Sequence, residues 1–182
     1  MIYMLINLKG IMENDVRPNW DHWFLSLCFV VSERSLDPST KHGCVVVSED
    51  KTILSVGFNG PPRGIDDSVV PLTRPEKYDW LIHSEDAAII NAARHGINLL
   101  GSTFYITGKP CEICFGKIIS VGAKKIIHGP VTSACVNEKS KLIIDKMNSK
   151  NQIELIEIAD FRPVILENSI KRINQYLQKT GE

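Results

Sequence analysis

Hydrophobic positions along the chain recur with two different spacings. Over Trp20–Arg34 they return every three or four residues, which is typical of a helix that buries one face. Cys44–Ser48 and Ile53–Phe58 are short β-branched runs separated by polar residues, a pattern that indicates a β-hairpin. The first third of the chain therefore predicts a helix followed by a hairpin.

A long segment without a hydrophobic period follows the hairpin. Asn59–Tyr78 is rich in Pro, Gly and Asp, which predicts a loop of the kind that often carries function. Tyr78 and Trp80 at its end have two interpretations, because their rings can stack on a base or pack the loop down. We expect packing.

Beyond this loop, helices and strands alternate. The expected elements are a helix over His83–His95, a strand over Thr103–Thr107, a helix over Cys111–Val121, a strand over Lys125–His128, a helix over Glu138–Met147, a strand over Ile153–Ile158 and a helix over Ile165–Leu177. Alternation of this kind indicates parallel strands. With the hairpin included, the sequence predicts an α/β fold, a three-layer α/β/α sandwich with a central mixed five-stranded sheet.

The length and charge of the chain narrow the kind of protein. A chain of 182 residues fits one domain, and we expect residues 20–182 to form it, with a helical C-terminal segment. Residues 1–19 are expected to be a flexible N-terminal extension. Lys plus Arg and Asp plus Glu both total 21, so no overall positive field favours a nucleic acid, and a small ligand is expected instead.

The number of cysteines and the composition of the first twelve residues indicate where in the cell the protein is expected. Five cysteines, an odd number, are typical of a protein in a reducing environment, where thiols stay free or bind metal. The first twelve residues include Asn7 and Lys9 and are too short to span a bilayer. We therefore expect no membrane partner and a cytoplasmic location, which is the host cytoplasm if the protein is viral.

Two short motifs stand at the starts of predicted helices, His83-Ser84-Glu85 and Pro110-Cys111-Glu112-Ile113-Cys114. Cys111 and Cys114 lie three residues apart, so both sulfurs can reach one ion from the first helical turn. With His83 they would fill three tetrahedral positions on Zn²⁺ and leave the fourth to water, as catalytic zinc sites do. Glu85 would then stand beside that water as a proton shuttle.

Each motif alone has a plainer interpretation. A single CxxC is often a redox pair or two buried thiols, and a single HxE is a frequent accident, but the two together at helix starts favour a metal site. The remaining cysteines, Cys28, Cys44 and Cys135, have no paired spacing, and we expect core or surface thiols.

These motifs make the chain similar to a known family. H-x-E followed by P-C-x-x-C is the general signature of zinc deaminases. From Trp20 to about Ile158 the chain resembles the deoxycytidylate (dCMP) deaminase family of the cytidine deaminase superfamily, including its phage members. Arg34–Pro38, Thr40–Gly43 and Gly57–Pro61 also occur in the family's order.

The resemblance implies an activity and its regulation. It implies hydrolysis of dCMP to dUMP and ammonia by a zinc-activated hydroxide, with Glu85 as proton shuttle, as a step that feeds thymidylate synthesis. It also implies a homo-oligomer, a hexamer in many members, that responds to dCTP and dTTP, with Mg²⁺ beside the triphosphate effector.

Five further residues receive roles. By position, Asn59 looks like the asparagine that binds the substrate sugar, and Gly57 and Gly60 belong to the loop linked to the effector. A plain turn is the alternative for the glycines. Arg34 and Lys41 are candidates for the substrate 5′-phosphate or the effector triphosphate, and a solvated surface charge is the alternative.

The sequence also departs from the family pattern. Ser84 replaces the usual Ala, Asp86 stands where a neutral residue is common, and His42 replaces the usual Val before Gly43. Residues 63–81 contain no Cys or His, so we expect one zinc ion per chain rather than the two of some phage relatives. Alternatives are a deaminase of another nucleotide or nucleobase (modified dCMP, a purine nucleotide or tRNA adenosine) and a catalytically silent nucleotide-binding regulator.

Overall fold

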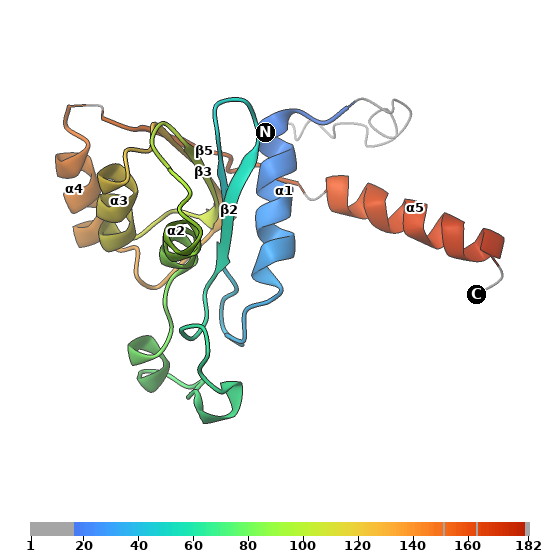
Figure 1. Ribbon diagram of the computed structural model, residues 1–182, viewed down its shortest axis with the longest axis horizontal. Helices are drawn as coiled ribbons and strands as arrows, with labels where there is room; N and C mark the ends of the chain where they lie inside the picture. The colour runs from blue at the N-terminus through green and yellow to red at the C-terminus, as the bar shows by residue number, and fades with distance from the viewer. Residues whose placement is uncertain (1–16, 151, 163, 181–182) are drawn as a thin grey trace, which may run out of the picture.

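The computed structural model describes residues 17–150, 152–162 and 164–180 (Figure 1). Its elements are α1 (Trp20–Ser32), β1 (Gly43–Val47), β2 (Ile53–Phe58), two short 3-10 helices (Asp67–Val69 and Glu76–Asp79), α2 (Ser84–Arg94), β3 (Thr103–Gly108), α3 (Glu112–Ser120), β4 (Lys125–Val131), α4 (Glu138–Met147), β5 (Glu154–Glu157) and α5 (Val164–Thr180). Every predicted helix and strand is present. Most of the expected N-terminal extension, residues 1–16, lies outside the described residues.

The strands form one five-stranded sheet in the order β2-β1-β3-β4-β5. β1 pairs antiparallel with β2 and with β3, whereas β3, β4 and β5 run parallel. The antiparallel part comes from the hairpin, and the parallel part comes from strands connected through helices. The predicted mixed sheet is confirmed.

Helices cover both faces of this sheet (Figure 1). On one face, α1 packs Phe24, Leu25 and Cys28 against Val45, Val47, Tyr105 and Ile127. On the other face, α2 and α3 contribute Ala88, Phe115 and Ile118 to a cluster with alternate residues of β1, β3 and β4. All five residues of β1 are buried because the strand is central and has helices on both sides. The three-layer sandwich is confirmed, and Cys28 and Cys44 are core thiols as expected.

Gly57 lets α2 lie directly on β2. A Cβ atom at this position would stand 2.3 Å from the carbonyl oxygen of Ser84 and 2.3 Å from the backbone nitrogen of Ala88. Real Cβ atoms do not approach so closely, so only glycine allows this contact. The start of α2, where His83 and Glu85 lie, is thereby fixed against the sheet.

α5 extends away from the rest of the molecule and touches it through α1 (Figure 1). Several of its apolar side chains are exposed, among them Ile170 and Ile173. None of the described helices is long and apolar enough to cross a membrane.

Candidate metal centre and active site

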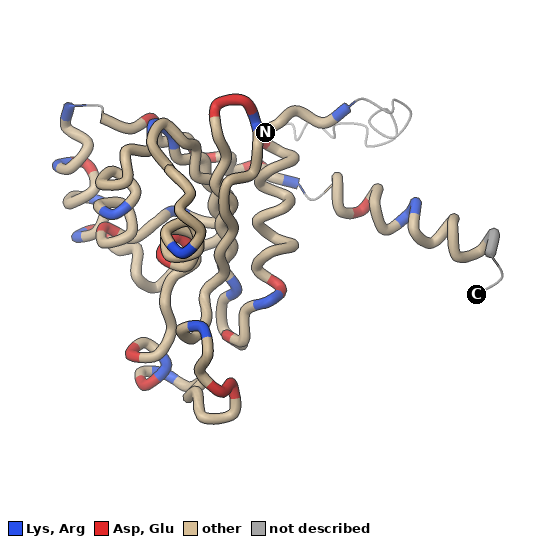
Figure 2. Tube along the Cα trace, in the orientation of Figure 1, with Lys and Arg blue, Asp and Glu red and all other residues tan. Residues whose placement is uncertain are grey.

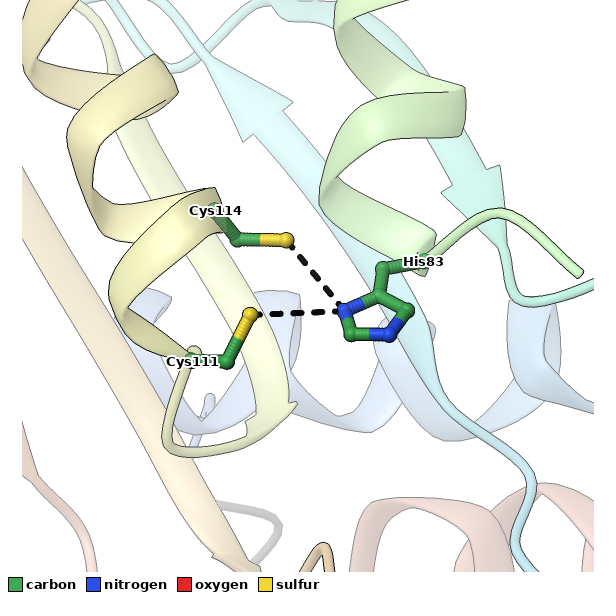
Figure 3. A group of neighbouring side chains, drawn as sticks. All are labelled: His83, Cys111 and Cys114. Carbon is green, nitrogen blue, oxygen red and sulfur yellow. Dashed lines mark hydrogen bonds between the residues drawn. The ribbon is translucent and has the colours of Figure 1, made fainter. Parts of the chain in front are cut away.

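The starts of α2 and α3 bring His83, Cys111 and Cys114 together (Figure 3). His83 is the N-cap residue of α2 and Cys111 that of α3, and Cys114 lies in the first turn of α3. The His83 Nδ1 atom is 3.5 Å from Cys111 Sγ and 3.4 Å from Cys114 Sγ. The three donor atoms lie within 4.8 Å of one another.

These separations fit a zinc ion. With Zn–N of about 2.0 Å and Zn–S of about 2.3 Å, tetrahedral geometry places nitrogen and sulfur roughly 3.5 Å apart. The donor set is one imidazole and two thiols. Among the described residues, no fourth protein ligand joins this cluster. Three protein ligands and an open position are typical of catalytic zinc.

The helix starts also favour a thiolate. The hydrogen bond from the Cys114 thiol, together with that from His83, lowers the pKa of Cys111 to about 4. The same sharing of a proton, with burial, raises the pKa of Cys114. One thiolate is therefore favoured before any ion binds, and both sulfurs lie where the helix dipole stabilises negative charge.

Glu85 lies in the first turn of α2 and is only 5% exposed. The hydroxyl of Ser84 donates to its Oε2 over 2.9 Å. Burial raises the pKa of the Glu85 carboxyl, despite the opposing charge of His83 and the Ser84 hydrogen bond. Because Glu85 is not one of the clustered donors, its carboxylate is available for proton transfer.

A cavity of about 430 Å³ opens onto these residues. His83, Glu85 and Cys111 line it. The other lining residues are Asp37, Thr40, His42, Asn59, Arg74, Lys77, Tyr78, Leu81, Ile82, Ser84, Gly108, Lys109, Glu112, Ile113, Ser133, Ala134 and Cys135. This volume is in the range of small-molecule sites. Lys109 and the exposed Arg74 are cations that an anionic ligand could reach.

The structure places the other predicted residues in different settings. Asn59 lines the cavity, but its Oδ1 accepts from the His42 N–H over 2.7 Å and its Nδ2 donates to the Thr40 carbonyl over 3.0 Å. Arg34, Lys41, Gly57 and Gly60 are not part of the lining. Lys41 instead pairs with Glu33 at 2.9 Å on the surface.

The loop before α2 contributes residues that sequence reasoning missed. Lys77 is 1% exposed, and its Nζ lies 2.7 and 2.8 Å from the two carboxylate oxygens of Asp37. Arg74 and Lys77 both stand near the ring of Tyr78, at 5.9 and 5.6 Å from its centroid. The sequence signal for this segment was its lack of a regular hydrophobic spacing. That signal predicted a functional loop but did not identify the residues within it.

The expectation that Tyr78 and Trp80 pack the loop down stays a prediction, because both side chains are only partly buried. Tyr78 is 46% exposed and lines the cavity, and Trp80 is 40% exposed. The buried Lys77–Asp37 pair holds this part of the loop against the domain.

Charges of both signs are scattered along the chain, and both occur in the loop between β2 and α2 (Figure 2). Asp86, the unusual acidic residue after Glu85, pairs with Lys117 of α3 at 2.6 Å. Its charge is thus neutralised by a partner on the neighbouring helix and does not stand alone beside Glu85.

Comparison with known proteins agrees with the site. The family model described as the cytidine and deoxycytidylate deaminase zinc-binding region matches residues 18–130. Human deoxycytidylate deaminase is 32% identical over 114 residues, 59% of this chain and 63% of that protein. A probable deoxycytidylate deaminase of Caenorhabditis elegans is 39% identical over 126 residues, 67% of this chain and 60% of that protein. The chain thus spans about three fifths of the length of these curated relatives.

Solved structures show the same fold. A dCMP deaminase from the cyanophage S-TIM5, in complex with dCMP and dUMP, superposes with a TM-score of 0.64 at 22% identity and covers 79% of this chain and 99% of that one. The family model covers more than half of the chain, including all three candidate metal ligands and Glu85. The chain therefore belongs to the cytidine and deoxycytidylate deaminase family.

Proposed function

We propose that the protein is a zinc-dependent hydrolase that converts dCMP to dUMP and ammonia. The observation that carries the proposal is the cluster of His83, Cys111 and Cys114 at a cavity that His83, Cys111 and the buried carboxylate of Glu85 line. The names of the curated relatives support dCMP as substrate. The phage structure of the same fold, which holds dCMP and dUMP, is consistent with that choice.

His83, Cys111 and Cys114 would hold the zinc ion, which when bound lowers the pKa of water and so supplies hydroxide near neutral pH. Glu85 would take a proton from the attacking water and deliver it to N3 of the cytosine ring. After the water oxygen adds to C4, Glu85 would take the remaining proton from the new C4 hydroxyl and pass it to the amino group, so that the C4 carbonyl forms as the C4–N4 bond breaks and ammonia leaves. The Ser84 hydroxyl would hold Glu85 in place through its hydrogen bond.

The rest of the cavity would position the nucleotide. Arg74 and Lys109 are the cations that we propose for the single phosphate, with Tyr78 beside Arg74. Asn59 would act on the sugar from its place in the lining, while its amide holds the backbone of residues 40 and 42. Arg34 and Lys41, outside the lining, are better suited to an effector than to the substrate.

Regulation and assembly are a separate part of the proposal. Control by dCTP and dTTP with Mg²⁺, an effector loop that includes Gly57 and Gly60, a homo-oligomer and a place in thymidylate supply are inferred from the family resemblance. Gly57 lies in β2 rather than in the loop that follows it, and its close packing on α2 offers a route by which an effector at that loop would reach Glu85.

Ammonia release tests the proposal. The zinc-loaded protein is given dCMP, CMP, deoxycytidine, dAMP or dGMP, with and without dCTP and Mg²⁺, beside Glu85→Ala. We expect turnover of dCMP alone or far above the others, and none with the variant. Preference for another nucleotide would overturn the substrate, and nucleotide binding without any reaction would support a silent regulator.

A further inference from the structure

We propose that His42 donates a hydrogen bond from Nε2 to an acceptor on the substrate base and is a specificity residue of this chain. The inference deepens the proposed function and rests on it.

The His42 ring is held at the cavity from two sides. Its backbone N–H donates to Asn59 Oδ1 over 2.7 Å, and its Nδ1 lies 3.1 Å from the hydroxyl oxygen of Thr107. Thr107 is fully buried near the end of β3, and His42 directly precedes β1. The ring is therefore oriented by the central strands rather than by a mobile loop.

The other ring nitrogen of His42 has no partner. Among the described residues, Nε2 is one of three buried side-chain polar atoms without a hydrogen bond. Buried polar groups are almost always paired, and an orphaned one in a ligand cavity indicates a partner that arrives with the ligand or its water. His42 belongs to the cavity lining.

The hydrogen-bond network makes this atom a donor. Thr107 Oγ1 accepts from the backbone N–H of Gly43 over 3.2 Å, and His42 Nδ1 is the one acceptor among the described residues that the Thr107 hydroxyl contacts, so we assign the hydroxyl hydrogen to the contact with Nδ1. Nδ1 then accepts, and the ring proton resides on Nε2. Burial, aided by the nearby charge of His83, lowers the pKa of His42 to about 4, so the ring is neutral near pH 7.

The position of His42 favours the base over the phosphate. The His42 ring contacts Thr107, which lies in β3 four residues before Cys111, and both His42 and Cys111 line the cavity, so His42 lies at its metal end. The proposed phosphate cations, Arg74 and Lys109, come from other segments, the loop before α2 and the turn before α3. Cytosine and uracil share the acceptor O2, so the same contact would serve substrate and product.

Binding of dUMP, the proposed product, tests this contact without turnover. Calorimetry compares the wild type with His42→Leu, which removes the donor, and His42→Gln, whose amide nitrogen can replace it. His95→Leu, the same change at an exposed histidine after α2, is the matched control. We expect about tenfold weaker dUMP binding for His42→Leu, recovery toward wild type for His42→Gln, and no change for the control.

A second ligand locates the contact. Binding of 2-deoxyribose 5-phosphate, which lacks a base, should be the same for wild type and His42→Leu. Equal loss for both ligands would overturn the assignment to the base, and unchanged dUMP binding would overturn the contact itself. A wild type that deaminates dCMP while His42→Leu binds dUMP normally would refute only this inference, whereas an inactive wild type that does not bind dUMP would refute both.

A measurement on the unaltered protein covers the case in which His42→Leu does not fold. In protein with ¹⁵N-labelled histidine, His42 should show the Nε2–H tautomer at pH 7, and its Nε2 signal should move when dUMP is added. An Nδ1–H tautomer, or an Nε2 signal that ignores dUMP, would contradict the proposal.

Discussion

At the scale of single residues, the site depends on two acidic side chains with different surroundings. Glu85 is buried and bonded to Ser84, whereas its neighbour Asp86 is paired with Lys117. A carboxylate without a cationic partner, next to a cluster of metal donors, can gain and lose a proton during a reaction. The charge of Asp86 is neutralised by its ion pair with Lys117, so Asp86 serves to link α2 to α3.

This difference gives a first prediction. Glu85→Gln keeps the size and a hydrogen-bond acceptor but cannot carry the proton, so we expect kcat to fall by roughly 10²- to 10⁴-fold. Zinc content measured by mass spectrometry should be unchanged, because Glu85 is not one of the clustered donors. Asp86→Asn is the matched control and should keep most of the activity. A Glu85→Gln protein with near-normal turnover would remove Glu85 from the mechanism.

Lysines show why sequence patterns locate some residues and miss others. The metal ligands were predictable because their chemistry requires fixed spacing within a few residues. Lys41 and Lys77 have no such local mark, yet one is on the surface with Glu33 and the other is buried with Asp37, forty residues away along the chain. Only the folded chain brings Lys77 and Asp37 together.

At the scale of elements, the pair Asp37–Lys77 joins two segments that form the cavity wall. Asp37 follows α1 and also accepts from the backbone N–H groups of Ser39 and Thr40, over 2.8 and 3.3 Å. Lys77 lies in the short 3-10 helix Glu76–Asp79. The ion pair thus fixes the loop before α2 to the turn before β1.

Removing one partner should loosen this wall. Lys77→Met leaves a buried carboxylate without its cation, which costs about 3 kcal/mol, and for a chain of this length the Tm should fall by roughly 10 °C. Lys77→Met with Asp37→Asn removes both charges and keeps the acceptor for Ser39 and Thr40. Thermal unfolding should show the double variant more stable than Lys77→Met alone. If Lys77→Met melts like the wild type, the pair does not hold the loop.

The same pair predicts a dependence on pH. Burial alone would raise the pKa of Asp37, but Lys77 and the N–H groups of Ser39 and Thr40 hold it below its usual value. The stabilisation is therefore complete above about pH 4 and is lost as the pH falls through the lowered pKa. The difference in the free energy of unfolding between the wild type and the double variant, measured by urea titration, should shrink as the pH falls from about 4 through the lowered pKa of Asp37. A constant difference would contradict the charge pairing.

Helices and strands were predictable, and the loop was not, for one physical reason. The spacing of apolar residues reflects which face of an element is buried, and this signal exists for α1 or β1 independently of the partner. Residues 59–82 take their shape from contacts with other segments, such as the ion pair of Lys77 with Asp37 and the hydrogen bond from Arg63 to Asn91. Tyr78 was therefore assigned to packing although it lines the cavity.

At the scale of the whole molecule, the candidate zinc site connects two helices. α2 lies on the hairpin strand β2, and α3 follows the parallel strand β3, so the two helices belong to the antiparallel and parallel parts of the sheet. Their first turns meet through His83, Cys111 and Cys114 and through the pair Asp86–Lys117. An ion at this point would couple both parts of the domain.

Removal of the ion should therefore lower the stability of the whole domain. An ion that binds only the folded chain adds about 2.7 kcal/mol at a hundredfold excess over its Kd, so complete chelation should lower the Tm by roughly 5–10 °C. Cys114→Ser, which lacks one zinc ligand, should have the lower Tm without any chelator, and adding the chelator should not change it. Cys135→Ser, which removes a thiol outside the ligand set, should keep one zinc per chain and respond like the wild type. A wild-type Tm that is unchanged after all zinc is removed would mean that the site holds its shape through protein contacts alone, such as Asp86–Lys117 and the packing of α2 on Gly57.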